Sequence, residues 1–258
     1  MTMMRKYLTR RSALATLIGL AGFRCLTSTW ARAAYSRRSQ GCCITADEFN
    51  VFVGQQDPKA SYLSDDSPIE KSGNPAFDFA LAHGLARISK LFSVVPGFAY
   101  YDDSDSKNAF ASPEVRMDKA DGTVLFGQNL LKDQLAVDDG DVYVLAICAH
   151  EFGHVVQFKK DLIAKLNKGQ SDVKRSELHA DFLAGYFAAH RKHEDSDFPA
   201  VKFAVVAHQL GDFQRSQQHH GTPNERAAAI SEGFKTFKED GLAFDEAVDM
   251  GVQYVLSI

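Results

Sequence analysis

The sequence has no excess of basic residues, since 29 lysines and arginines are set against 33 aspartates and glutamates. The formal net charge of -4 at pH 7 therefore provides no basic field that would attract nucleic acid or an anionic membrane. Internal repeats and low-complexity tracts are also lacking, which excludes a repeat architecture. The remaining composition, 45% hydrophobic and 24% charged over 258 residues, is typical of a soluble globular chain with one sizeable core.

The N-terminal apolar run, residues 13–23, is too short to span a membrane. Basic residues precede it within positions 5–11, and Ala31-Arg32-Ala33 follows it with the small-x-small pattern of a cleavage site. Residues 1–33 are therefore interpreted as a secretory signal peptide, and residues 9–14 resemble a twin-arginine (Tat) signal. We expect export to the periplasm or the medium, with no stable membrane anchor after the signal is removed.

The segment 34–72 is polar and has no sustained period, so we expect a poorly structured arm before a folded domain at 73–258. Removal of the signal leaves Cys42, Cys43 and Cys148, an odd number in an oxidising compartment. Cys148 falls on an apolar helical stripe and is predicted to be a buried small hydrophobe. How Cys42 and Cys43 pair is not indicated by the sequence.

The strongest chemical signal is the five-residue motif His150-Glu151-Phe152-Gly153-His154. On an α-helix, positions i and i+4 share a face, so His150 and His154 can present two imidazole nitrogens to one metal ion. Glu151 leaves that face at an angle and is placed to act as a general base on a water molecule at the metal. The apolar spacing of residues 141–155 predicts that this helix is buried.

A catalytic zinc site needs a third protein ligand, and the second predicted helix, which opens at residues 175–181, supplies candidates. We expect Glu177 to be the third ligand and Asp181, one turn later, to accept a hydrogen bond from a ligand histidine. Small residues at positions 180, 184 and 188 would let the two helices approach closely. Two alternatives stay open: His179 as the ligand, or Glu177 and Asp181 as ordinary solvated charges.

The residues that follow His154 exclude a metzincin, because Val155-Val156-Gln157-Phe158 provides neither the glycine nor the third histidine of that class. The pattern instead resembles the gluzincins, specifically the bacterial neutral zinc metallopeptidases and the related CAAX-processing type. In those families Ala-His-Glu-x-Gly-His, here residues 149–154, is followed by Glu-Leu-x-Ala-Asp-x-x-Ala-Gly, here 177–185. The resemblance spans about residues 75–240 and implies a zinc peptidase.

Two upstream segments, residues 108–111 and 122–127, resemble the strand pair that precedes the active-site helix in these families. The resemblance implies that the second of them is an edge strand that binds substrate. Thr123, Val124, Leu125 and Phe126 would then hold an extended peptide through main-chain hydrogen bonds.

Residues 220–226, His-Gly-Thr-Pro-Asn-Glu-Arg, are similar to a segment that closes the site in the same families. One interpretation is that His220, favoured over His219, donates a hydrogen bond to the oxyanion formed during hydrolysis. The other is purely structural, because Thr222-Pro223-Asn224-Glu225 has the N-cap, proline and glutamate of a helix start. Both interpretations remain open on the sequence alone.

The predicted fold is α+β and zincin-like, mainly helical, with a small, mainly antiparallel sheet beside the active-site helix. Helices are predicted at 74–94, 197–213, 223–238 and 244–258. The acidic turn at residues 102–105 lacks the glycine and glutamate of a calcium loop and is interpreted as solvated.

The expected function is Zn²⁺-dependent endopeptidase activity on extracytoplasmic proteins or peptides. Two alternatives remain: hydrolysis of another amide such as that of peptidoglycan, or a zinc-stabilised binding or chaperone-like protein without catalysis.

Overall fold

The computed structural model describes residues 73–258, apart from residues 105, 116 and 212–218. The predicted signal peptide (1–33), the arm (34–72), Cys42 and Cys43 lie outside the described residues. The elements in chain order are α3 (Pro75–Phe92), β1 (Gly97–Tyr101), β2 (Ala109–Ser112), β3 (Thr123–Gly127), α4 (Gln128–Leu135), α5 (Gly140–Lys159), α6 (Ile163–Leu166), α7 (Lys174–Glu194), α8 (Val201–Leu210), α9 (Pro223–Lys238) and α10 (Phe244–Leu256). The chain is mainly helical with a small sheet, which agrees with the predicted α+β class.

The three strands form a mixed sheet in the order β1-β3-β2. Strand β3 pairs in parallel with β1 and antiparallel with β2, so the prediction of a mainly antiparallel sheet is wrong for half of the pairings. The central place of β3 explains why all five of its residues are buried. Val124 and Phe126 face the main core, whereas Leu125 packs with Tyr101 and Phe110 on the opposite face.

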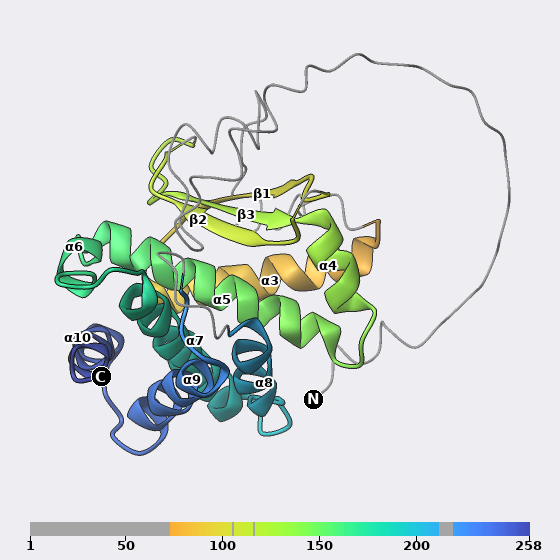
Figure 1. Cartoon of the computed structure of the whole chain (residues 1–258). Coiled ribbons are helices and arrows are strands. Elements are labelled where there is room, and N and C mark those ends of the chain that lie inside the picture. Colours follow the sequence, from red (N-terminus) through yellow and green to blue (C-terminus); the bar gives the residue numbers. More distant parts are fainter. Residues whose placement is uncertain (1–72, 105, 116, 212–218) are drawn as a thin grey trace, which may run out of the picture.

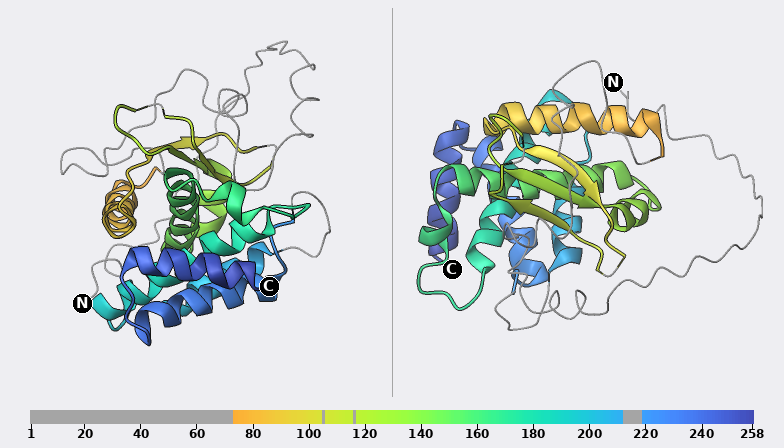
Figure 2. Two further views of the ribbon diagram at one scale, coloured as in Figure 1. Left: turned by 90° about the vertical axis from the view of Figure 1, so that its left-hand side faces the viewer. Right: turned by 90° about the horizontal axis from the view of Figure 1, so that it is seen from above.

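Helix α5 lies at the centre of the fold, between the sheet and the C-terminal helices (Figures 1 and 2). It contacts α3, α4, α7, α8 and the sheet, and every residue from Val142 to Gln157 is buried. A helix covered on all sides need not be amphipathic, which explains why apolar residues surround its polar ones. Within the described residues, no helix combines the length and apolarity needed to cross a membrane.

Local signals set the ends of two helices that frame this centre. Asn74 caps α3 by accepting hydrogen bonds from the main-chain N–H groups of Ala76 and Phe77. Helix α9 begins with the predicted capping box, in which Thr222 and Glu225 each bind the other's main-chain N–H. The bounds of α9 agree with those expected from the sequence.

Helices α7 and α9 pack unusually closely because a glycine faces main-chain atoms on each side. A Cβ atom on Gly185 of α7 would lie 2.0 Å from the carbonyl oxygen of Ile230 in α9. A Cβ atom on Gly233 of α9 would lie 1.8 Å from the carbonyl oxygen of Phe182 in α7. This reciprocal contact sets the middle of α9 against the middle of α7, and Arg226, one turn before Ile230, reaches Asp181.

Candidate metal centre

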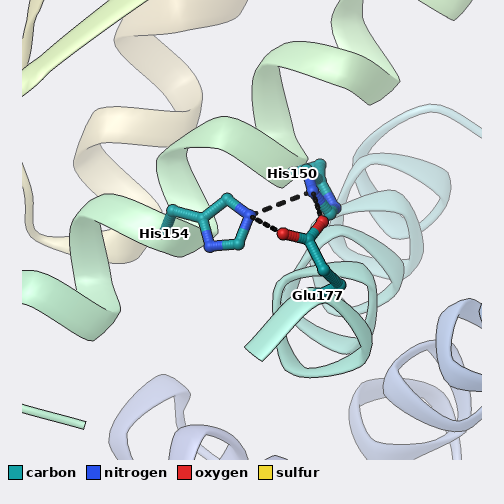
Figure 3. A group of neighbouring side chains, drawn as sticks. All are labelled: His150, His154 and Glu177. Atoms are coloured by element: carbon teal, nitrogen blue, oxygen red, sulfur yellow. Dashed lines mark hydrogen bonds and ion pairs between the residues drawn. The ribbon is translucent and has the colours of Figure 1, made fainter. Parts of the chain in front are cut away.

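His150 and His154 on α5 and Glu177 on α7 point toward one another in the interior (Figure 3). The two helices can approach because Gly153 faces Ala180, whose Cα would lie 3.0 Å from an added Cβ. One ligand atom from each of the three residues lies within 4.8 Å of the others, and all three residues are buried. The group could therefore hold a metal ion. Its members are the three ligand residues expected from the sequence.

The two imidazole nitrogens and the two carboxylate oxygens of Glu177 lie at distances compatible with a small ion in tetrahedral coordination. The two histidine Nε2 atoms are 3.2 Å apart. His150 Nε2 lies 3.3 Å from Glu177 Oε2, and His154 Nε2 lies 3.6 Å from Glu177 Oε1. Bonds of about 2.05 Å at tetrahedral angles would separate neighbouring donors by about 3.3 Å. The three side chains therefore stand close to the spacing that such an ion requires.

Asp181 holds His150 as expected, because its Oδ1 accepts a hydrogen bond of 2.8 Å from the histidine Nδ1. A carboxylate oxygen at Nδ1 places the ring proton there and leaves the Nε2 lone pair facing the metal position. Asp181 in turn binds Arg226 through both of its oxygens. Burial alone raises the pKa of Asp181, but Arg226 and His150 bring that pKa below its ordinary value.

His179 does not point at the candidate metal position, so the structure does not support the alternative in which His179 is the ligand. Its Nε2 lies 3.2 Å from the carbonyl oxygen of Val248, and its Nδ1 lies 3.1 Å from the amide nitrogen of Gln157. Both ring nitrogens are therefore engaged away from the metal position. Burial lowers the pKa of His179 to about 4, so the ring is neutral at physiological pH. The other alternative, solvated helix charges, is also wrong, because Glu177 and Asp181 are buried.

Glu151 is buried beside the ligand residues, and its Oε2 has no hydrogen-bond partner among the described residues. Burial raises the pKa of its carboxyl to about 7, although His150 and His154 act in the opposite direction. Burial also raises the pKa of Glu177, but His154, His150 and His220 hold it well below its usual range. The two neighbouring glutamates therefore differ in their readiness to take up a proton.

With His150 and His154 neutral, as metal ligation requires, the buried side chains of this interior carry an excess of carboxyl groups. Glu151, Glu177 and Asp181 are buried carboxyl groups, and Arg226 is the buried guanidinium that faces them. Full ionisation would leave two negative charges uncompensated in a region of low dielectric. A divalent cation held by His150, His154 and Glu177 would balance these charges.

A cavity of about 80 Å³ opens beside His150 and Glu151. His150, Glu151, Asp181, Arg226 and His220 contribute polar groups to its wall, and apolar residues of α4, α5, α7, α8 and α9 contribute most of the remainder. Among the described residues that line it, His220 is present and His219 is not. Residues 107–109, at the start of β2, also line the cavity.

The expected position of the substrate-binding strand is wrong. Thr123, Val124, Leu125 and Phe126 belong to β3, which pairs with β1 on one side and with β2 on the other. Both of its edges are thus already occupied by main-chain hydrogen bonds, and no peptide can add to it. Among the described strands, the one that reaches the cavity is β2, through its first residue, Ala109.

Sequence reasoning assigned no role to Gln157 or Arg226, although both complete the surroundings of the ligands. Arg226 closes the segment 220–226, which was recognised only by its resemblance, and Gln157 lies three residues after His154 on the same helix. Comparison with models of known families, with curated proteins and with solved structures found no match for this chain. The assignment of a function therefore rests on the geometry and chemistry of this centre.

Proposed function

We propose that the protein is a zinc-dependent endopeptidase acting on extracytoplasmic proteins or peptides. The observation that carries this proposal is the convergence of His150, His154 and Glu177 at distances compatible with one small ion, with the carboxyl group of Glu151 beside them. It agrees with the resemblance of residues 149–154 and 177–185 to the gluzincin motifs.

Zinc is the ion that suits two imidazoles and one carboxylate in a small tetrahedral site. When bound, zinc supplies Lewis-acid chemistry, which polarises a substrate carbonyl and makes water more acidic. Three protein ligands leave a fourth position for water or substrate, as catalytic rather than structural zinc sites require.

The side chains around the metal position have distinct roles in this proposal. Glu151, whose carboxyl pKa lies near neutrality, accepts the proton of the attacking water and delivers it to the leaving amine. His220 lines the same cavity and donates a hydrogen bond to the developing oxyanion. Asp181 and Arg226 hold the ring of His150 in one tautomer and one orientation.

The substrate lies along β2 in this proposal, in place of β3. Among the described residues, β2 (Ala109–Ser112) pairs with β3, and its first residue, Ala109, lines the cavity, so a peptide that enters the cavity passes the start of β2. The apolar wall of the cavity, which includes Ile147, Phe203 and Val206, would receive an apolar side chain next to the cleaved bond. Such a wall favours polypeptides over the polar sugar-peptides of peptidoglycan.

The test is cleavage of an unfolded protein by the zinc-loaded mature chain and by Glu151→Gln. The parent should cleave, whereas Glu151→Gln should bind zinc with similar affinity and lose at least about 100-fold in kcat. Glu239→Gln, the same chemical change at an exposed position after α9, is the matched control and should cleave like the parent.

Equal cleavage by Glu151→Gln and the parent would contradict the role of Glu151. A zinc-loaded parent that cleaves neither unfolded proteins nor peptides would favour the binding or chaperone-like alternative.

A further inference from the structure

The two histidines of the metal centre are held in different ways. His150 donates to Asp181, a carboxylate whose charge is balanced by Arg226. His154 faces a neutral amide instead, because its Nδ1 lies 3.0 Å from Oε1 of Gln157. The partner of His154 therefore adds no charge to the interior and acts through hydrogen bonds alone.

The direction of every hydrogen bond around Gln157 follows from two main-chain carbonyl groups. Its Nε2 lies 2.7 Å from the carbonyl oxygen of Ser176, which can only accept, so this end of the amide is the NH₂ group. Oε1 must then accept from His154. That bond requires the proton on Nδ1 of His154 and leaves its Nε2 lone pair directed at Glu177.

The second carbonyl group fixes His179 in the same manner. The carbonyl oxygen of Val248 accepts from Nε2 of His179, so the Nδ1 of that ring is unprotonated and accepts from the amide of Gln157. A directed series of hydrogen bonds therefore runs from His154 through Gln157 and His179 to Val248 in α10. Each member has only one protonation state that satisfies its neighbours.

Close packing keeps α10 within reach of this series. Gln157 and His179 are fully buried. Gly251 of α10 lies against His179, and an added Cβ would be 3.1 Å from the ring Cδ2. The absence of a side chain at Gly251 allows the carbonyl group of Val248, one turn earlier, to reach the ring.

We propose that Gln157 and His179 are positioning residues that set the tautomer of His154 and couple the metal centre to helix α10. The inference rests on the proposed metal function of the site. Partners that orient a ligand histidine typically change metal affinity by about 10- to 100-fold when they are removed. His179, although it is neither a ligand nor a catalytic residue, should therefore affect metal binding through Gln157.

The test measures the zinc dissociation constant by chelator competition for the parent, Gln157→Met, His179→Phe and the double variant. Each single variant should weaken zinc binding by about 10- to 100-fold. The double variant should weaken it little more than the worse single variant, because both changes interrupt one series. Gln253→Met, the same substitution at an exposed position of α10, is the matched control and should stay within about twofold of the parent.

The visible absorption of the Co²⁺-loaded chain provides a second readout that reports ligand geometry. It should change in both single variants while thermal unfolding of the metal-free chains remains cooperative. Zinc affinities within threefold of the parent, or single effects that multiply in the double variant, would overturn the inference. If Gln157→Met does not fold, His179→Phe alone provides the test. An unchanged Co²⁺ spectrum in His179→Phe would then overturn the proposed role of the hydrogen-bond series.

Metal binding by the parent distinguishes a failure of the proposed function from a failure of the proposed role of Gln157 and His179. If the parent binds neither zinc nor cobalt, both the proposed function and the proposed role of the hydrogen-bond series are wrong. If the parent binds zinc and the variants bind it equally well, only the proposed role of the hydrogen-bond series is wrong.

Discussion

Arg226 on α9 donates hydrogen bonds to both carboxylate oxygens of Asp181 on α7. Its Nε lies 2.7 Å from Oδ2 and its Nη2 lies 2.8 Å from Oδ1. The planar guanidinium fits this two-point contact, and both side chains are buried. Since Asp181 also accepts a hydrogen bond from Nδ1 of His150, α9 acts on the candidate metal centre without supplying a ligand.

Arg226→Lys should therefore weaken zinc binding even though it keeps the positive charge. A lysine offers a single ammonium group and cannot form two parallel hydrogen bonds. We expect zinc affinity to fall by about tenfold and the metal-free chain to lose about 2 kcal/mol in urea unfolding. Arg87→Lys, at an exposed ion pair with Glu194, is the control and should change stability by less than about 0.5 kcal/mol. Parent-like zinc affinity in Arg226→Lys would show that the two-point contact is unnecessary.

Gly233→Ala should lower both the stability of the chain and its affinity for zinc, although Gly233 is not at the candidate metal position. Alanine favours a helix over glycine by about 1 kcal/mol, but its Cβ would collide with the main chain of Phe182. We expect a net loss of about 1–3 kcal/mol together with weaker zinc binding, because Arg226 would shift relative to Asp181. Ser231→Ala, at an exposed position of α9, should leave both quantities nearly unchanged. A Gly233→Ala chain as stable as the parent would mean that α7 and α9 can separate without penalty.

His220→Ala should lower turnover without removing the metal. If His220 donates to the oxyanion, kcat should fall by about 100- to 1000-fold, while KM and zinc affinity stay within a few-fold of the parent. The measurement is steady-state cleavage of a peptide, with zinc content determined on the same samples. A kcat within a few-fold of the parent would leave His220 with the structural role alone.

Under the proposed peptidase function, Val206→Ala should shift the cleavage preference toward bulkier apolar residues beside the cleaved bond. Val206 is buried and lines the cavity near Phe203, so its truncation enlarges the apolar wall. A peptide library cleaved by the parent and the variant reports the change, which one or two methyl groups limit to about 10- to 200-fold. An unchanged preference would place the substrate side chain elsewhere.

Glu225 should make stability sensitive to acid. Burial alone raises its pKa, but Thr222 and Lys174 bring that pKa below the ordinary value of 4.5. The unfolded chain then binds a proton at a higher pH than the folded chain, so this stabilisation is complete above about pH 4.5 and is lost as pH falls further. The side chain is 35% exposed, so the effect should stay below about 1 kcal/mol. Urea unfolding from pH 7 to pH 3.5 should show a steeper loss in the parent than in Glu225→Gln, and equal slopes would contradict the prediction.

The features that could be predicted from the sequence are those set by neighbours along one helix. The i, i+4 spacing of His150 and His154 and the capping box before α9 are local, and the structure has both. Asp181 was also predictable, because it lies one turn after Glu177 on the same helix. Gln157 shares a helix with His154, but its role depends on α7 and α10, which only the packed fold brings to it.

The order of the strands could not be predicted for a related reason. All of the residues in β2 and β3 are buried, so no alternation of polar and apolar residues distinguishes an edge strand from a central one. Asp103 was interpreted as part of a solvated turn, yet its carboxylate is buried and binds the main-chain N–H groups of Asn129 and Leu130. Contacts between distant segments decide both cases, and neither leaves a pattern in the nearby sequence.

The hydrogen bonds that fix His150 and His154 also bear on which ion the protein selects. Their imidazole rings cannot turn away, because Asp181 and Gln157 are themselves held by groups on other helices. An entering ion meets donors that have little conformational entropy left to lose, so more of the interaction energy remains as affinity. If the site holds zinc as proposed, the same rigidity should disfavour ions that prefer six oxygen ligands, such as magnesium and calcium. Discrimination among metals is then a property of how α7, α9 and α10 pack around α5.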